Sequence, residues 1–208
     1  SRVGQVAIIT GRAVEVVIPL AGLDRVPGLV VMGQYGAQRW RDGELTQAPA
    51  APGLTRARDA LAALDLGPGV SVEDKGLSLT VHTRAAADPQ GALEQLSPVL
   101  HAVAEVAGMG LHPGRFVWEI RPADQDKGTA LRTLLTDCTS VLFAGDDLGD
   151  LAAFDEVEAF RARGGHGVVV CSDSAEAPAE LRASADLVVP GPEGVVALLT
   201  ELLASLSS

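Results

Sequence analysis

The stretch "SVLFAGDDLGDLAAF", Ser140 to Phe154, joins an apolar run to a group of carboxylates. Residues 141–144 are all apolar, and a short apolar run closed by a glycine is typical of a strand buried in a parallel sheet. Asp146, Asp147 and Asp150 follow directly. Carboxylates that gather repel one another, and each is costly to remove from water. The stretch therefore predicts a buried strand with a cation site at its end.

The second half of the chain alternates strand and helix patterns. Apolar runs predict strands at 140–145, 167–172 and 186–190, and segments of helical period predict helices near 148–162, 176–184 and 193–204. Strands that alternate with helices favour a parallel sheet covered on both faces. Near the start, the run "QVAIIT" at 5–10 predicts another buried parallel strand, with a short helical stretch after it.

The middle of the chain has a different pattern. The run at 28–33 predicts a strand, and Asp42-Gly43 is a signal for a tight hairpin turn. Residues 70–84 alternate apolar and polar until Gly76, which predicts two paired strands or one bulged strand. Further elements are expected as helices at 54–64 and 90–107 and a strand at 115–122. The segment from about 28 to 119 is therefore predicted to be an inserted α+β module.

Composition excludes several classes of protein. The 208 residues carry a net charge of −11, and the pI is near 4.7, which argues against a nucleic-acid groove. No apolar run reaches membrane-spanning length, and the first residues lack the pattern of a signal peptide. Cys138 and Cys171 are far apart in apolar surroundings. We expect them to be core residues of a protein in the reducing cytoplasm.

The chain has fourteen arginines but only two lysines, Lys75 and Lys127. Both stand in the tripeptide Asp-Lys-Gly. A chain that otherwise uses arginine as its cation is expected to need a compact ammonium group at these two places. The alternative is that coding bias removed lysines and these two survived by accident.

Three loops that follow strands carry chemical groups suited to a phosphate and a metal. Ligands of an open parallel sheet bind beyond the carboxyl ends of its strands. Thr10-Gly11-Arg12 offers a hydroxyl and backbone amides to a phosphate oxygen, and Lys127 beside a helix N-terminus suits the same anion. Asp146 and Asp147 suit Mg²⁺, which prefers oxygen ligands. Each group also has a structural alternative: Thr10 could cap a turn, Lys127 could be solvated, and the aspartates could cap a helix.

The order Thr, Lys, Asp-Asp resembles the haloacid dehalogenase superfamily and, more closely, trehalose-6-phosphate phosphatase of the actinobacterial kind. The segments that carry the resemblance are "IITGR" (8–12), "GQYGAQRW" (33–40), "EDKGLSLTVHTR" (73–84), "EIRPADQDKGTAL" (119–131) and "GDDLGDLAAF" (145–154). The resemblance implies an α/β fold with a haloacid dehalogenase-like, doubly wound parallel-sheet core and an inserted α+β cap. The core would contain residues 1–27 and 120–208, and the cap, residues 28–119, would set substrate specificity.

By the same resemblance, the protein would be a Mg²⁺-dependent hydrolase of trehalose 6-phosphate that acts through an aspartyl-phosphate. Thr10 would hold the phosphoryl group, and Lys127 would neutralise it and orient the nucleophile. Asp146 would bind Mg²⁺ directly, with Asp147 and Asp150 assisting the metal or positioning Lys127. The predicted substrate-binding residues are Gly11, Arg12, Glu73, Lys75 and Glu119. The alternative for Glu73 and Lys75 is a cross-strand ion pair on a wet face of the sheet.

The sequence departs from the family pattern in two places. Gly149 replaces the threonine of the commoner Gly-Asp-Asp-x-Thr-Asp form. The superfamily attacks phosphorus with an aspartate of a strand-borne Asp-x-Asp-Gly-Thr motif upstream of the threonine, but the nine residues before Thr10 contain no aspartate. Asp124 and Asp126 do not fit that role, because they follow Pro122 rather than a buried strand, and Asp126 is better explained as a helix cap.

We therefore expect the first strand of the core to be missing from these 208 residues and the chain alone to be inactive. The strands at 5–10 and 140–145 are expected not to pair with each other. Two other functions stay open, a related sugar phosphatase with another substrate and a non-catalytic protein that binds sugar phosphates. His82 and His112 are interpreted as structural, and Tyr35 and Trp40 as packing residues rather than sugar-stacking ones.

Overall fold

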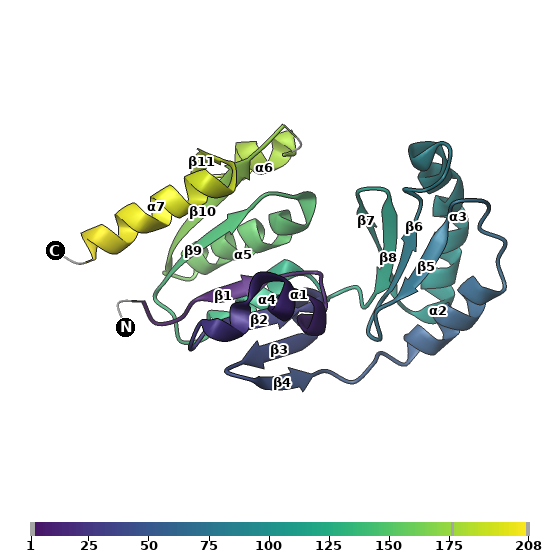
Figure 1. The fold of residues 1–208 in the computed structure, drawn as a ribbon, viewed down its shortest axis with the longest axis horizontal. Helices are drawn as coiled ribbons and strands as arrows, with labels where there is room; N and C mark the ends of the chain where they lie inside the picture. Colours follow the sequence, from purple (N-terminus) through teal and green to yellow (C-terminus); the bar gives the residue numbers. More distant parts are fainter. Residues whose placement is uncertain (1–2, 176, 207–208) are drawn as a thin grey trace. The chain divides into compact units, whose positions relative to one another are not determined.

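The structure is a computed structural model that describes residues 3–175 and 177–206 (Figure 1). Its internal contacts divide the chain into two compact units. The first unit contains residues 1–9, 28–30 and 126–208, and the second contains residues 10–27 and 31–125. The boundary runs through strand β2, so each unit is built from segments distant in sequence.

The first unit contains a parallel sheet of order β11-β10-β9, as the alternating pattern predicts. Its strands are β9 (Ser140–Gly145), β10 (His166–Asp173) and β11 (Leu187–Pro190). The helices of this unit are α4 (Lys127–Leu134), α5 (Leu151–Ala162), α6 (Ala179–Ser184) and α7 (Gly191–Ser205). The register aligns Gly145 with Cys171, so β9 and β10 present their carboxyl ends on one edge.

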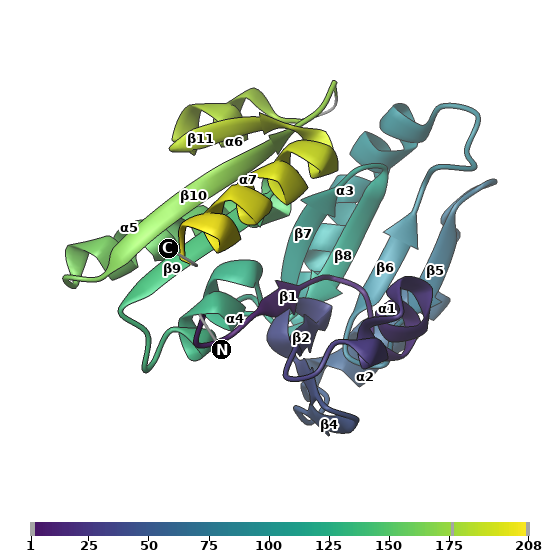
Figure 2. The same ribbon diagram turned by 60° about the vertical axis from the view of Figure 1, so that its left-hand side comes forward.

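Helices cover both faces of this sheet (Figures 1 and 2). On one face, Phe154 and Val157 of α5 pack with Leu131 of α4 and Leu181 of α6 into a core cluster that includes Cys171 of β10. On the other face, α7 lies against β10 and β11. Cys138 and Cys171 are both free thiols. The predicted doubly covered parallel sheet is thus confirmed for this half of the chain.

Strand β9 is less buried than predicted. It is the end strand of its sheet, and residues 141–144 are only half-buried. Strand β1 (Ala7–Ile9) is likewise the end strand of its sheet, with Ala7 exposed. Within the described ranges the two strands do not pair with each other, as predicted. Both were predicted to be buried strands; they are only partly buried, because each has a strand neighbour on one side only within the described residues.

A second sheet has the order β1-β2-β3-β4 and contains the predicted hairpin. Its other strands are β2 (Val30–Gly33), β3 (Gln38–Arg41) and β4 (Glu44–Gln47). Asp42 and Gly43 have φ of 49° and 91°, the left-handed pair that a tight hairpin turn requires. Helix α1 (Val14–Ala21) and the 3₁₀ turns η1 (Leu23–Arg25) and η2 (Gln34–Gly36) occupy the connections.

The third sheet is antiparallel and belongs wholly to the second unit, with order β5-β6-β8-β7. Its strands are β5 (Ser71–Asp74), β6 (Leu79–His82), β7 (Gly110–Gly114) and β8 (Val117–Arg121). Residues 70–84 thus form two strands that turn near Gly76, the first of the two predicted alternatives. Strand β7 was not predicted, because "GLHPG" has the composition of a turn; as an edge strand it tolerates Pro113.

The two faces of this antiparallel sheet differ in character. Helices α2 (Gly53–Ala62) and α3 (Pro89–Ala107) pack on one face, where Leu79, Val81 and Ile120 are fully buried. The strand registers place a row of polar residues on the opposite face. This row contains Glu73 of β5, Thr80 of β6, Glu119 of β8 and His112 of β7. The alternation of apolar and polar residues along the strands therefore separates a core face from a polar face.

The compact units do not follow the predicted domain bounds at every point. Residues 10–27, assigned to the core from the sequence, are grouped with residues 31–125 by their contacts. The sheet that contains residues 71–82 is separate from the sheet of β9, as the predicted division requires. Among the helices of the described part of the chain, none is long and apolar enough to cross a membrane.

Candidate active site

The loop after β9 brings three aspartates together at the carboxyl end of the strand. β9 ends at Gly145, and a side chain at that position would collide with the carboxyl group of Asp150. Glycine thus lets the chain turn closely around that carboxylate. Asp146 and Asp147 are exposed, whereas Asp150, at the end of the 3₁₀ turn η3 (Leu148–Asp150), is only 3% exposed.

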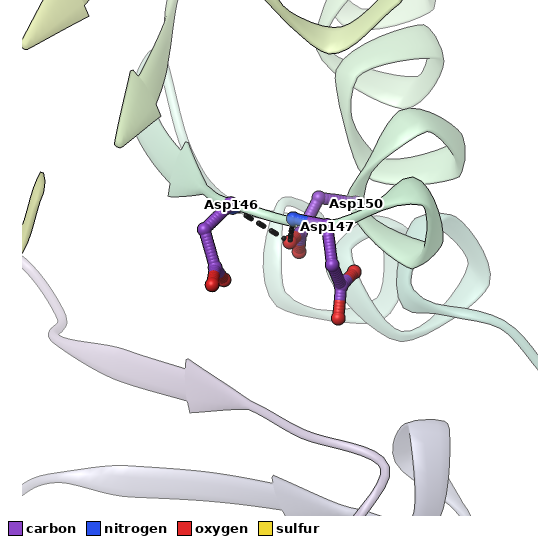
Figure 3. A group of neighbouring side chains, drawn as sticks. All are labelled: Asp146, Asp147 and Asp150. Atoms are coloured by element: carbon purple, nitrogen blue, oxygen red, sulfur yellow. Dashed lines mark hydrogen bonds between the residues drawn. The ribbon is translucent and has the colours of Figure 1, made fainter. Parts of the chain in front are cut away.

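The buried carboxylate of Asp150 is held by three donors, of which Figure 3 shows the two backbone N–H groups. The backbone N–H groups of Asp146 and Asp147 both donate to its Oδ2, at 3.0 and 3.1 Å. Lys127 donates through Nζ to its Oδ1 at 2.8 Å. Asp150 therefore fixes both the course of the loop and the position of the ammonium group.

Lys127 reaches the carboxylates from the first turn of α4. Asp126 caps this helix, because its side chain accepts a hydrogen bond from the N–H of Thr129 at 2.7 Å; the predicted cap is confirmed. The Nζ atom of Lys127 also lies 3.3 Å from Asp147 Oδ1. Burial opposes the charge on Lys127, but Asp150 and Asp147 outweigh it and raise the pKa of the ammonium group. Lys127 is thus a buried, charged cation.

The same burial raises the pKa of Asp150, and the ion pair with Lys127 counteracts that rise. One oxygen of each of the three aspartates lies within 4.8 Å of the others. The cluster therefore has three carboxylates but one ammonium group, which pairs with Asp147 and Asp150, and an excess of negative charge is left at an exposed edge. Oxygen donors in this number and spacing fit Mg²⁺, which binds through one or two carboxylates and keeps several waters. The arrangement can receive a divalent cation.

The Thr10-Gly11-Arg12 loop is stabilised within the second unit. The N–H of Thr10 donates to the carbonyl of Met32 at 2.9 Å, and the N–H of Arg12 donates to Thr10 Oγ1 at 3.1 Å. Thr10 thus stabilises the turn of its own loop, which was the structural alternative. Gly11 lies so close to Tyr35 that an added Cβ would be 2.6 Å from the ring. Because Thr10 and Lys127 belong to different units, their convergence with Asp146 stays a prediction.

Glu119 is the centre of a network on the polar face of the antiparallel sheet, and it is 5% exposed. Its Oε1 accepts hydrogen bonds from Lys75 Nζ at 3.0 Å and Ser78 Oγ at 3.1 Å. Thr80 Oγ1 lies 3.4 Å from the same oxygen, and Arg121 Nε lies 3.6 Å from Oε2. Burial would raise the pKa of Glu119, but Lys75 above all, with Tyr35 and Arg121, lowers it. This carboxylate is therefore charged and is held in place by several donors.

Glu73 lies in the same cross-strand row as Glu119 but has a different partner. Its Oε2 atom is 2.9 Å from Nε2 of His82, and both side chains are partly exposed. Lys75 forms its ion pair with Glu119 rather than with Glu73. The structure thus brings Lys75 and Glu119 together, whereas Glu73, in the same row as Glu119, is paired with His82 and partly exposed.

Sequence reasoning did not identify three members of this network, Ser78, Thr80 and Arg121. Arg121 follows Glu119 by two residues on β8, so the strand period alone places the two on one face. That signal was available in "WEIRP". The positions of Ser78 and Thr80 depend on the pairing of β6 with β8, whose partners are separated by about forty residues and cannot be read from local pattern.

Comparison with known proteins identifies the family. A profile of the trehalose-phosphatase family matches residues 1–187. A probable trehalose-phosphate phosphatase of Sinorhizobium fredii is 32% identical over 162 residues, which make up 74% of this chain and 59% of that protein. The chain thus spans about three fifths of the length of the curated relatives it matches.

Solved structures share the fold. The C-terminal domain of a Candida albicans trehalose-6-phosphate phosphatase has a TM-score of 0.74 at 18% identity and covers 95% of this chain and 77% of its own. A haloacid dehalogenase-like hydrolase from Bacteroides thetaiotaomicron has a TM-score of 0.66 at 13% identity, with coverage of 94% and 86%. The protein therefore has a haloacid dehalogenase-like α/β fold, and the chain belongs to the trehalose-phosphatase family.

Proposed function

We propose that the protein is a Mg²⁺-dependent phosphatase that hydrolyses trehalose 6-phosphate to trehalose and phosphate. The observation that carries this proposal is the carboxylate cluster of Asp146, Asp147 and Asp150, with the buried Lys127, in a chain of this family. The relatives at 30% identity or more bear the names trehalose-phosphate phosphatase and trehalose-6-phosphate phosphatase. We propose a small-molecule substrate and no nucleic-acid or membrane partner; the acidic composition supports the exclusion of nucleic acid.

In the proposed mechanism, Asp146 would hold Mg²⁺ directly, and Asp150 would assist in holding the metal. The metal, when bound, would neutralise charge on the phosphoryl oxygens. Lys127 supplies a fixed positive charge to the same oxygens, because its ion pairs with Asp147 and Asp150 keep it protonated and limit its movement. The carboxylate of Asp147 takes part by holding this ammonium group in place.

Thr10, Gly11 and Arg12 would bind the phosphoryl group from the loop after β1. The Thr10 oxygen already accepts the N–H of Arg12, so its hydroxyl hydrogen is free to point at a phosphate oxygen. The backbone amides of Gly11 and Arg12 would add further donors. The tight packing of Gly11 against Tyr35 supports the view that this loop has one fixed conformation.

Glu73, Lys75 and Glu119 would bind the sugar from the polar face of the antiparallel sheet. Sugar hydroxyls need both acceptors and donors, and this face offers carboxylates together with an ammonium group. We propose that residues 28–119 act as a cap that supplies these contacts, and that residues 1–27 and 120–208 act as the phosphatase core. The separation of the β5–β8 sheet from the β9–β11 sheet supports this division.

The proposed reaction passes through an aspartyl-phosphate, and no aspartate precedes Thr10 in the 208 residues. We propose that a segment outside this sequence supplies the nucleophile on a strand between β1 and β9, and that the 208-residue chain alone is inactive. The end positions of β1 and β9 in their sheets support this idea, since each has an edge open to another strand. The free thiols of Cys138 and Cys171 accord with a cytoplasmic location.

Phosphate release from trehalose 6-phosphate tests the proposal in the full natural chain. We expect turnover that depends on Mg²⁺ and is abolished by a chelator and by Asp146→Asn. Asp155→Asn, which changes an exposed aspartate of α5, is the matched control and should behave like the wild type. Retained Mg²⁺-dependent turnover in Asp146→Asn would remove this residue from the metal site.

A second experiment tests which substrate the protein hydrolyses. Glu73→Ala should reduce hydrolysis of trehalose 6-phosphate far more than hydrolysis of a small aryl phosphate, because the small substrate cannot use contacts on the polar face. Equal losses on the two substrates would contradict the assignment of Glu73 to the sugar. Efficient turnover of other sugar phosphates, with none of trehalose 6-phosphate, would point to a different substrate for the same chemistry.

A further inference from the structure

The segment after β2 contains two consecutive non-glycine residues in a strained conformation. Gln34 and Tyr35 have φ of 45° and 55°, in the left-handed region. This conformation is unfavourable for a residue with a Cβ atom, and it persists only where its surroundings fix it. Strain of this kind occurs at sites where the chain holds a functional group in place. We call residues 33–36 the elbow.

Hydrogen bonds fasten the elbow to the predicted phosphate loop. The N–H of Gln34 donates to the carbonyl of Arg12, and the N–H of Tyr35 donates to the carbonyl of Thr10, both at 2.9 Å. From the other side, Gln125 Nε2 donates to the carbonyl of Gln34 at 2.6 Å. The elbow therefore has a fixed position relative to the loop that carries Thr10.

The side chain of Gln34 reaches the β5–β6 turn. Its Nε2 donates to the carbonyl of Lys75 at 2.9 Å, although the residues are 41 positions apart in sequence. Gln34 is 1% exposed, and its Oε1 atom has no hydrogen-bond partner among the residues that the structure describes. A buried unpaired acceptor is unfavourable, and an apolar side chain of the same shape would avoid it. The presence of a glutamine at position 34 is therefore explained by the hydrogen bond from its Nε2 group to the backbone carbonyl of Lys75.

Tyr35 reaches the second predicted sugar ligand. Its hydroxyl hydrogen-bonds to the carboxylate of Glu119, and its ring lies 4.1 Å below the guanidinium group of Arg121. The Tyr35 ring also lies directly against Gly11. Two neighbouring residues of the elbow thus contact Lys75 through its backbone and Glu119 through its carboxylate.

We propose that Gln34 is a positioning residue for sugar recognition, which acts through Lys75 together with Tyr35. The elbow fixes the Lys75 ammonium group and the Glu119 carboxylate at a set position relative to the Thr10 loop. The protein would then select a sugar phosphate by the distance between its phosphate and its hydroxyls, because the groups that bind the two ends have a fixed spacing. This inference rests on the proposed function, since it assigns Lys75 and Glu119 to the sugar.

The chemical reactivity of the two lysines tests the positioning directly in the folded chain. Acetylation by an N-hydroxysuccinimide ester, quantified for each lysine by mass spectrometry, reports the freedom of Lys75, with Lys127 as internal reference. In Gln34→Met the rate at Lys75 should rise about two- to tenfold, the factor expected for loss of one hydrogen bond. The rate at Lys127 should not change. Global destabilisation would raise both rates, so the ratio isolates a local effect.

Gln90→Met is the matched control, because Gln90 is exposed on α3 of the same unit and its Nε2 donates to Glu94 of the same helix. It should leave the rate at Lys75 unchanged. If Gln34→Met does not fold, Gln34→Asn replaces it: asparagine tolerates the left-handed conformation but is too short to reach the Lys75 carbonyl. Unchanged Lys75 reactivity in a folded variant at position 34 would overturn the proposal.

Ligand measurements separate this inference from the proposed function. Trehalose 6-phosphate should protect Lys75 from acetylation in the full natural chain. Gln34→Met should raise the Michaelis constant for trehalose 6-phosphate by a larger factor than that for a small aryl phosphate. One outcome is faster Lys75 acetylation in the variant but no protection of Lys75 by trehalose 6-phosphate. It would support the positioning role and contradict the assignment of trehalose 6-phosphate as the substrate. Protection with equal changes in the two Michaelis constants would overturn the positioning role.

Discussion

The loop after β9 and the polar face around Glu119 both contain buried carboxylates, but they balance charge in opposite ways. In the loop, three carboxylates lie together with one ammonium group, which pairs with two of them, and two of the three carboxylates are exposed. On the sheet, one carboxylate is surrounded by Lys75, Arg121 and hydroxyl donors. The first arrangement has more negative than positive charge. In the second, cationic side chains of the protein balance the carboxylate without any bound ion. The contrast distinguishes a site for a cation from a preformed surface for hydrogen bonding.

The largest expected effect comes from removing the single cation of the loop. Lys127→Met would leave the buried carboxylate of Asp150 unpaired, and we expect a loss of about 3–5 kcal/mol in the free energy of unfolding. Lys75→Met is the matched change on the sheet, where Glu119 keeps Arg121 and Ser78 as partners, so its loss should be smaller. Urea unfolding of both variants checks the order. Equal losses would break the distinction between the two regions.

A smaller effect is expected from Glu119→Gln, and it should depend on pH. The pKa of Glu119 is lowered in the folded state, mainly by Lys75 against the effect of burial. Its contribution is therefore present above the pKa of an unfolded glutamate, about 4.3, and is lost as pH falls through the folded value. We expect the variant to be less stable by about 1.5–3 kcal/mol near neutral pH.

Thermal unfolding of wild type and Glu119→Gln from pH 7 to pH 3 measures this dependence. The difference in melting temperature should shrink as the pH falls. A difference that stays constant over the whole range would mean that the charge on Glu119 adds nothing to the network, and that only its shape matters.

The smallest effect is expected at Gly149, where the commoner family form has threonine. A Cβ at this position would lie 3.0 Å from Asp147 Oδ1 and 3.7 Å from Lys127 Cε, so the carboxylate of Asp147 would have to move slightly. Loss of glycine also lowers the entropy of the unfolded chain, which favours folding by about 0.4–1 kcal/mol. We therefore expect Gly149→Thr to change the free energy of unfolding by less than about 1 kcal/mol, measured in urea. A large loss would show that the loop has no room to adjust.

Local patterns in the sequence predicted most elements of the fold. The apolar run of β9, the Asp42-Gly43 turn and the cap at Asp126 each depend on neighbouring residues, and all are confirmed. Strand β7 was missed because Gly110 and Pro113 are poor strand formers, and its pairing with β8 outweighs that preference. The burial of β9 was overestimated, since an apolar run indicates a strand but not its number of neighbours.

The candidate site was predictable where its residues lie close in sequence. Asp146, Asp147 and Asp150 are on one loop, and their clustering follows from a few residues of chain. The partner of Glu73 was not predictable, because its contact with His82 depends on the β5–β6 register. Likewise, nothing local indicates that Gln34 reaches Lys75, since two left-handed residues redirect its side chain. The local sequence pattern does not reveal which strands pair with each other or how their residues are aligned.

The end position of β9 affects how the purified chain would behave. Residues 141–144 are apolar and uncharged, so they present a row of backbone N–H and C=O groups without a side chain that repels a visiting strand. Such an edge is a template for self-association, in which a second copy extends the sheet across a molecular boundary. The same edge would accept a short synthetic peptide of matching apolar residues, and such a peptide would compete with copy-to-copy contact. Self-association of the purified 208-residue chain and binding of such a peptide would then both depend on the edge of β9.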